Sequence, residues 1–226
     1  MMQESKGNMY PGVETWNPLA GECKHECSYC STNSLMRYPI IKTKYSGGLR
    51  LDYKTLSKSL GNKNKIIFVV AQNDLFAKEV PDYWIEEVFL RCKRFDNTYL
   101  FQTKNPRRFI EFYDKFPSKT ILCTTIETNR SYPQMGKAPS VFERSLAMAF
   151  LPEFHKQITI EPIMRFDLEE MVVLIKQCNV ESVSIGADSK RNNLPEPSKE
   201  KILALIDELQ KFTVINQKRN LKRLLL

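Results

Sequence analysis

Long apolar runs are missing from this chain, and their absence removes one class of protein from consideration. No stretch of the 226 residues approaches the roughly 20 consecutive apolar residues that a membrane-spanning helix needs. The first ten residues, MMQESKGNMY, lack the apolar core of a signal peptide, so we expect no secretory signal and a cytoplasmic protein with no membrane partner. No internal repeat or low-complexity tract is present.

Histidine is scarce, and half of the cysteines are concentrated in one short segment. The chain has two histidines and six cysteines, and three of the cysteines lie between residues 23 and 30. The other three, Cys92, Cys123 and Cys178, are scattered in apolar surroundings. Because we expect reduced thiols in a cytoplasmic protein, the group predicts a metal site rather than a disulfide framework.

Acidic residues are outnumbered by basic ones, which gives a net charge of +8. Such a surplus suits a polyanionic partner such as nucleic acid, although a solubility charge spread over the surface is the commoner meaning. The basic C-terminal segment 211–226 has five basic residues and no acidic one. Hydrophobic residues make up 42% and charged residues 27%, which is ordinary for a globular protein, and we expect one domain over residues 1–226.

Short apolar runs alternate with helical patterns along the chain. Six runs rich in β-branched or aromatic residues are expected to be strands, over 65–71, 98–103, 120–126, 157–160, 182–185 and 212–215. Their apolar character on both faces is typical of strands buried in a parallel sheet. The residues after the last of them are expected to form either a basic helix that closes a barrel or a mobile arm.

The segments between these runs carry helix start signals. Asn105 followed by Pro106 predicts a cap and a first helical residue, and capping boxes are predicted at Ser140 and Asp167. Further helices are expected after Pro81 and Ser198. Alternation of this kind predicts an α/β fold with a parallel sheet. Because a full eight-unit barrel usually needs about 250 residues, we favour a partial (β/α)6–7 TIM-type barrel over an open doubly wound sheet.

The spacing C-x3-C-x2-C of Cys23, Cys27 and Cys30 places three thiols in one loop, residues 21–31. A [4Fe–4S] cluster is normally held by four thiolates, and no fourth cysteine lies nearby in sequence. One iron would then be open, as in reactive rather than structural metal sites. The alternative is zinc with His25 or a distant cysteine as fourth ligand, but the second cysteine pair typical of such sites is missing.

This motif, with the aromatic Tyr29 directly before the last cysteine, resembles the signature of the radical S-adenosylmethionine superfamily. The similarity extends from about residue 9 to the C-terminus. It includes the segments TWNPLAGECKHECSYC, NDLFAKEVPDYWI, FQTKNPRRF, TTIETNR, ITIEPIMRFDLEE and SIGADSK. Together these segments resemble a group of proteins from archaea and phages that is distantly similar to spore photoproduct lyase.

The resemblance implies a chemistry for the open iron. In the superfamily the amino and carboxylate groups of S-adenosylmethionine chelate that iron, and an electron from the reduced cluster cleaves the cofactor. The products are methionine and a 5′-deoxyadenosyl radical, which abstracts a hydrogen atom from the substrate. An electron donor such as flavodoxin or ferredoxin is therefore an expected partner.

Polar residues at strand ends are the candidates for holding S-adenosylmethionine. The Gly-Gly-Glu that the superfamily often has after the second strand is replaced here by Gln-Asn-Asp, so the methionine amine is assigned to Asn73 or Asp74. Lys104, at the end of the next strand, is similar in place to a lysine of spore photoproduct lyase and could pair with the methionine carboxylate. A solvated loop lysine is the other reading.

Two acids that end apolar strands, Glu127 and Glu161, also invite a functional reading, because unpaired buried charges are rare. Strand alternation places Cys123, Thr125 and Glu127 on one face, where Thr125 or Glu127 could bond ribose hydroxyls. Arg144 is expected to pair with one of the two acids. We expect Asp188 to contact adenine or substrate, and Tyr29 to pack beside the cluster or adenine.

The substrate is less defined than the cofactor. Spore photoproduct lyase uses a cysteine where this chain has Ala71 or Gln72, so that repair chemistry is not expected here. A nucleic acid or nucleotide is favoured by Lys42, Lys44, Arg107, Arg108 and the basic segment, and by the DNA substrate of the distant relative. The alternatives are a non-catalytic iron–sulfur or zinc module that binds nucleic acid, and a radical enzyme acting on a peptide or small metabolite.

Overall fold

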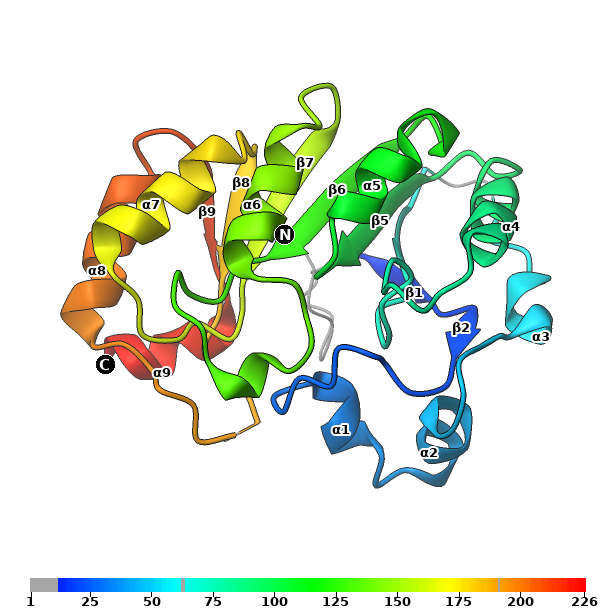
Figure 1. The fold of residues 1–226 in the computed structure, drawn as a ribbon, viewed down its shortest axis with the longest axis horizontal. Coiled ribbons are helices and arrows are strands. Elements are labelled where there is room, and N and C mark those ends of the chain that lie inside the picture. Colours follow the sequence, from blue (N-terminus) through cyan, green and yellow to red (C-terminus); the bar gives the residue numbers. More distant parts are fainter. Residues whose placement is uncertain (1–11, 62–63, 191) are drawn as a thin grey trace.

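The computed structural model describes residues 12–61, 64–190 and 192–226, and its centre is a sheet of seven parallel strands (Figure 1). The strands lie in the sheet in chain order, with β1 at one edge and β9 at the other. They are β1 (Glu14–Trp16), β4 (Ile66–Val69), β5 (Thr98–Thr103), β6 (Thr120–Thr125), β7 (His155–Ile160), β8 (Ser182–Ile185) and β9 (Val214–Gln217). The prediction of an α/β fold with a parallel sheet is confirmed.

Each of the six predicted apolar runs overlaps one strand of this sheet. The last prediction, 212–215, is wrong at its start, because the amides of Phe212 and Thr213 still bond to the carbonyl of Leu209 and so continue the turn after the preceding helix. The expectations for residues 1–10, and for the similarity beginning near residue 9, fall on a segment that lies outside the described residues.

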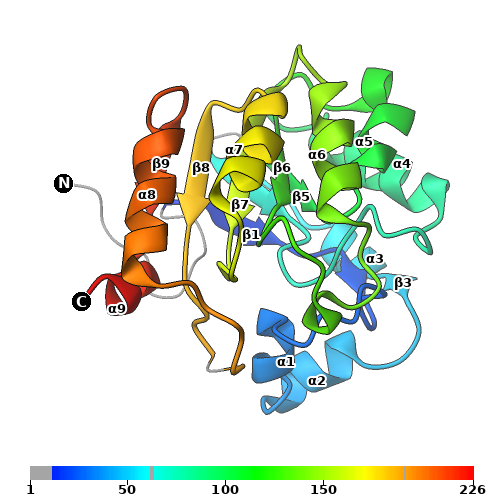
Figure 2. The same cartoon turned by 60° about the vertical axis from the view of Figure 1, so that its left-hand side comes forward.

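One face of the sheet is covered by a layer of helices, as Figures 1 and 2 show. The layer consists of α4 (Asp82–Cys92), α5 (Arg107–Glu111), α6 (Val141–Ala149), α7 (Leu168–Gln177) and α8 (Lys199–Leu209). Alternate strand residues such as Phe101 and Leu122 pack into the large core beneath these helices. Their neighbours along the strands, Leu100 next to Phe101 and Cys123 next to Leu122, point to the opposite face and join Phe68 in a separate small cluster. The two-residue period of strands thus divides the buried side chains between two faces.

The helix start signals are confirmed in part. Ser140 and Glu143 form the predicted capping box, and Ser198 caps α8 through the amide of Lys201. The predicted box at Asp167 is wrong: Asp167 precedes α7 but its carboxylate binds Arg130 instead of the helix amides. Asn105 makes no cap either, because its side-chain amide donates to the carbonyl of Phe76.

The helix predicted to open at Pro106 is shorter than its apolar pattern indicates. It ends at Glu111, and the chain continues as the 3-10 turn η1 (Tyr113–Lys115). This change of path lets both Phe112 and Phe116 reach the core, where their rings contact Phe76.

A small lobe that the sequence did not predict lies beside the first strand (Figure 1). It contains the antiparallel pair β2 (Leu19–Ala20) and β3 (Arg50–Leu51), and the helices α1 (Ser31–Leu35), α2 (Pro39–Tyr45) and α3 (Tyr53–Leu56). These elements are too short to show a clear period in sequence. The cysteine loop runs from β2 to α1, so both ends of the loop are anchored in this lobe.

The chain ends in β9, the turn η3 (Arg219–Leu221) and the short helix α9 (Lys222–Leu225). The expected strand followed by a basic helix is therefore present. Across the described residues no helix is long and apolar enough to span a membrane.

Candidate functional site

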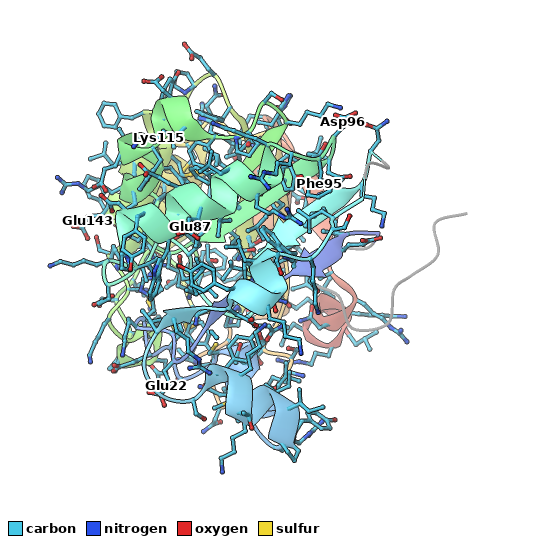
Figure 3. The ribbon with its side chains drawn as sticks, turned by 90° about the vertical axis from the view of Figure 1, so that its right-hand side faces the viewer. Glu22, Glu87, Phe95, Asp96, Lys115 and Glu143 are labelled. Carbon is cyan, nitrogen blue, oxygen red and sulfur yellow. The ribbon has the colours of Figure 1, made fainter. Side chains whose placement is uncertain are left out.

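The cysteine loop, residues 21–31, lies at the carboxyl edge of the parallel sheet. Its contacts are with the segments that follow β4, β5 and β6. In α/β proteins with parallel sheets, this edge is where ligands usually bind. Figure 3 shows Glu22, directly before the first cysteine, at the opposite end of the molecule from Asp96 and Lys115. A cavity of about 370 Å³ beside Asp96 is therefore remote from the loop.

The three thiols of the loop are close enough to affect one another electrostatically. Burial, together with the carboxylate of Asp74 and the thiolates of Cys30 and Cys27, raises the pKa of Cys23 to about 12. Burial also raises the pKa of Cys27, although Lys104 opposes this shift. Thiolates packed in this way are costly without a nearby cation, and a metal centre would supply that cation.

The segment Gln72–Asn73–Asp74 after β4 fastens the loop at three points. The carbonyl of Gln72 accepts a 2.9 Å hydrogen bond from Thr32, just after the third cysteine. The side-chain amide of Asn73 donates over 2.8 Å to the carbonyl of Gly21, just before the first cysteine. Asp74 binds His25, which lies between the first two cysteines.

Asp74 is the most highly connected of these three residues. Its carboxylate lies 2.7 Å from Nε2 of His25, and it accepts hydrogen bonds from the hydroxyl of Thr103 and from the backbone amides of Phe76 and Lys104. Burial would raise the pKa of Asp74, but His25 and the hydrogen bonds lower it below its ordinary value. Both oxygens are thus occupied by partners that hold the loop, and a role for Asp74 toward a methionine amine stays a prediction.

A second segment fastens the loop from its other side. This segment is η2 (Pro133–Met135) and the two residues after it. The thiol of Cys27 donates to the carbonyl of Met135 over 3.2 Å, and the amide of Lys137 donates to the carbonyl of His25 over 2.7 Å. Gly136 has a φ of +66°, and a Cβ atom there would lie 2.1 Å from the carbonyl oxygen of His25. The backbones approach so closely that only glycine fits.

Glu127 is fully buried beyond the end of β6, and three other predicted site residues contact it. Its carboxylate accepts hydrogen bonds from the hydroxyl of Tyr29 (2.5 Å), from Nη1 of Arg144 (2.8 Å) and from Nζ of Lys104. Burial would raise the pKa of Glu127, yet Lys104 and Arg144 lower it well below its usual range. Burial and the neighbouring carboxylate raise the pKa of Tyr29.

The Glu127 group carries one carboxylate and two cations, so its own charges leave a positive excess. Arg144 is fully buried, and its Nη2 atom has no hydrogen-bond partner among the described residues. Lys104 keeps some exposure and also lies over the ring of Tyr29. A site of this kind is chemically suited to receive an anionic group next to the cysteine loop.

Thr125 and Cys123 lie on the face of the sheet away from the helices. The hydroxyl of Thr125 accepts a hydrogen bond from Gln102 on the neighbouring strand. The predicted shared face holds for these two residues, because both lie within β6. It does not extend to Glu127, because the strand ends at Thr125.

Glu161 and Asp188 belong to a different group, at the carboxyl ends of β7 to β9. Glu161 pairs with Nζ of Lys218 over 2.6 Å and accepts from the side-chain amide of Asn220 over 2.7 Å. Arg144 therefore pairs with Glu127 and not with Glu161. The carboxylate of Asp188 caps the following turn through the amide of Asn192.

Sequence reasoning missed the partners that the C-terminal segment provides. Lys218 and Asn220 bind Glu161, and Arg223 binds Glu196 and the carbonyl of Asp188. The concentration of basic residues in the last sixteen positions is the available signal, but by itself it also fits a surface for nucleic acid.

The role of the cysteine loop as a metal site stays a prediction. Within the part of the chain that the structure describes, no three His, Cys, Asp or Glu side chains are arranged to hold one metal ion. A cubane cluster does not need that arrangement, because each thiolate binds a different iron. Cys23, Cys27 and Cys30 would be its ligands.

A family model described as "Protein of unknown function (DUF5131)" matches residues 12–165, which is more than half of the chain. The match includes the cysteine loop, both segments that fasten it, and the group around Glu127. It does not reach β8, β9 or the C-terminal segment. No curated protein matches the chain.

Proposed function

We propose that this chain, which belongs to the DUF5131 family, is a radical S-adenosylmethionine enzyme. The observation that carries the proposal is the fastened loop with Cys23, Cys27 and Cys30 at the carboxyl edge of the sheet. The other three cysteines are buried apart from it. Three thiolates leave one iron of a [4Fe–4S] cluster for S-adenosylmethionine. When bound, the cluster supplies the electron that cleaves this cofactor to methionine and a 5′-deoxyadenosyl radical.

The seven-stranded sheet, in this proposal, is the partial barrel of such an enzyme. Its strands follow each other in order, and the candidate residues gather where the strands end. The face of the sheet away from the helix layer, which contains Thr125 and Gln102, would then be the inside of the barrel.

The Glu127 group would hold the anionic part of S-adenosylmethionine. Lys104 is the cation of this group with exposed surface, so it is the residue that would meet the methionine carboxylate. The carboxylate of Glu127 accepts three donors, so it would reach ribose hydroxyls only if Tyr29 or Lys104 moved toward the ligand. Asn73, Glu161 and Asp188 stay predictions as ligands of the cofactor.

A nucleic acid or nucleotide is the substrate class that we propose, and the net charge of +8 supports it. The C-terminal segment supports it less than its composition suggested, because Lys211, Lys218 and Arg223 pair with acids of the chain itself. Affinity for single- or double-stranded DNA or RNA should fall steeply with salt. Absence of binding at low salt would contradict the proposed nucleic-acid substrate.

Anaerobic reconstitution with iron and sulfide tests the proposed cluster and its cleavage of S-adenosylmethionine. The protein with dithionite and S-adenosylmethionine should release 5′-deoxyadenosine, measured by chromatography, and should show the absorbance of an iron–sulfur cluster. Cys27→Ala should lose both signals, whereas Cys92→Ala, which removes a buried thiol far from the loop, should keep both. An intact cluster without cofactor cleavage would favour a non-catalytic module, and uptake of zinc alone would favour a zinc site.

A further inference from the structure

A groove of about 790 Å³ opens directly beside the cysteine loop, on the helix side of the molecule. Its walls come from three parts of the chain: Lys24 and His25 of the loop, the residues before α4, and the facing sides of α5 and α6. Because Lys24 and His25 lie between the first two cysteines, an object in the groove would touch the loop that carries the thiols.

The lining of the groove combines positive charge with exposed apolar surface. It has six basic and four acidic residues. Two of the acids, Asp82 and Glu111, are paired with Arg108, whereas Lys24, Lys78 and Arg107 form no ion pair among the described residues.

The apolar part of the lining is a stripe on two helices. Leu146 of α6 and Phe150, the C-cap residue directly after that helix, lie four positions apart, and they are 43% and 64% exposed. Ile110 of α5 faces the same groove, and Phe142 extends the stripe by one more turn. An apolar centre with charged residues around it is the usual composition of a protein–protein interface.

We infer that this groove docks an acidic one-electron carrier protein that reduces the cluster, an inference that rests on the proposed function. The reaction consumes an electron, and the chain supplies no second cluster, since its other cysteines are buried singly. The carrier must therefore bring its redox centre close to the cysteine loop. Unpaired lysine and arginine side chains would steer an acidic carrier, and a small apolar contact suits a transient redox encounter.

Nucleic acid is the competing occupant, and the lining disfavours it. A phosphate backbone would leave the apolar stripe of Leu146 and Phe150 uncovered. Arg144 connects the groove to the site, because it lines the groove and donates to Glu127, which binds Tyr29 next to the third cysteine.

The test compares two reductants on the reconstituted holoenzyme. Flavodoxin kept reduced by its reductase and NADPH is the carrier, and dithionite is the reductant that needs no docking. The variant Lys78→Glu should lower the carrier-driven rate of 5′-deoxyadenosine formation by about tenfold, as loss of electrostatic steering does. Its dithionite-driven rate should equal that of the unmodified enzyme.

The matched control is Lys199→Glu, which makes the same charge change on α8 and should keep both rates. Equal carrier-driven rates in the two variants would overturn the docking inference while dithionite activity upheld the proposed function. Loss of nucleic-acid affinity in Lys78→Glu with an unchanged carrier-driven rate would also overturn it. No product with either reductant in the unmodified enzyme would instead overturn the proposed function.

Discussion

Glu127 combines complete burial with a full negative charge, which is stable only because cations surround it. Glu127→Gln keeps the size of the side chain but leaves Lys104 and Arg144 without their counter-charge. Breaking one member of a buried ion pair costs about 3–5 kcal/mol, so we expect a loss of that order in urea unfolding. Glu169→Gln, on the exposed face of α7, should leave the unfolding free energy unchanged.

The same residue predicts a dependence of stability on pH. The pKa of Glu127 is lower in the folded protein than its ordinary value of 4.5, because Lys104 and Arg144 outweigh the effect of burial. Its contribution to stability is therefore complete above that ordinary value and is lost as the pH falls below it. The unfolding free energy of Glu127→Gln should fall less steeply in acid than that of the unmodified protein, and parallel curves would contradict this account.

Charged residues at the ends of strands could be identified as site candidates from the sequence. Lys104 and Glu127 stand out because a charge follows an apolar strand, and the structure brings both to Tyr29. The pairing of His25 with Asp74 could not be found in this way, because nothing local links two residues 49 positions apart. The partner of Arg144 was ambiguous for the same reason, since both acids that end strands were equally possible.

At the scale of elements, the long strands were predictable and the short pieces around the cysteines were not. A buried strand of four to six residues shows its apolar run, whereas β2, β3 and α3 have four residues or fewer and no period to detect. These pieces are positioned by contacts with other segments, such as the close approach of Gly21 to Gly48. The shape of the cysteine loop therefore depends on packing that no single segment encodes.

The contact between the loop and η2 makes a prediction about an element rather than a side chain. Gly136→Ala would place a methyl group against the carbonyl of His25 and also strain a left-handed backbone. We expect the unfolding free energy to fall by about 1–3 kcal/mol from the backbone strain alone, with the clash in addition.

Gly47→Ala is the matched control for that variant, since Gly47 has a φ of +76° and open space around its Cα. The two variants share the backbone strain, so the difference between their chemical denaturation curves isolates the contact with the loop. Equal losses of stability would show that this contact adds nothing.

At the scale of the whole molecule, the C-terminal segment joins the last strands of the sheet to one another. Leu221 is completely buried, and Lys218 and Asn220, which precede it in the chain, bind Glu161. Leu221→Ala should lower the unfolding free energy by about 2–5 kcal/mol, the range for buried leucines. Leu226→Ala removes the same group from a residue that is 90% exposed, so thermal unfolding should be unaffected. A mobile arm would give the same small effect in both variants.

The long-range contacts of the cysteine loop also determine when, during synthesis, the loop can reach its final shape. The loop is made early, but its partners Glu127 and Met135 come 98 residues after Tyr29 and 108 residues after Cys27. A ribosome that adds 5–20 residues per second needs roughly 5–20 seconds to make that stretch. Throughout this interval the thiols belong to a nascent peptide without its final shape. We therefore expect the proposed cluster to be delivered after this stretch has been made and has largely folded, so that cluster loading would follow the synthesis of the loop and its partners.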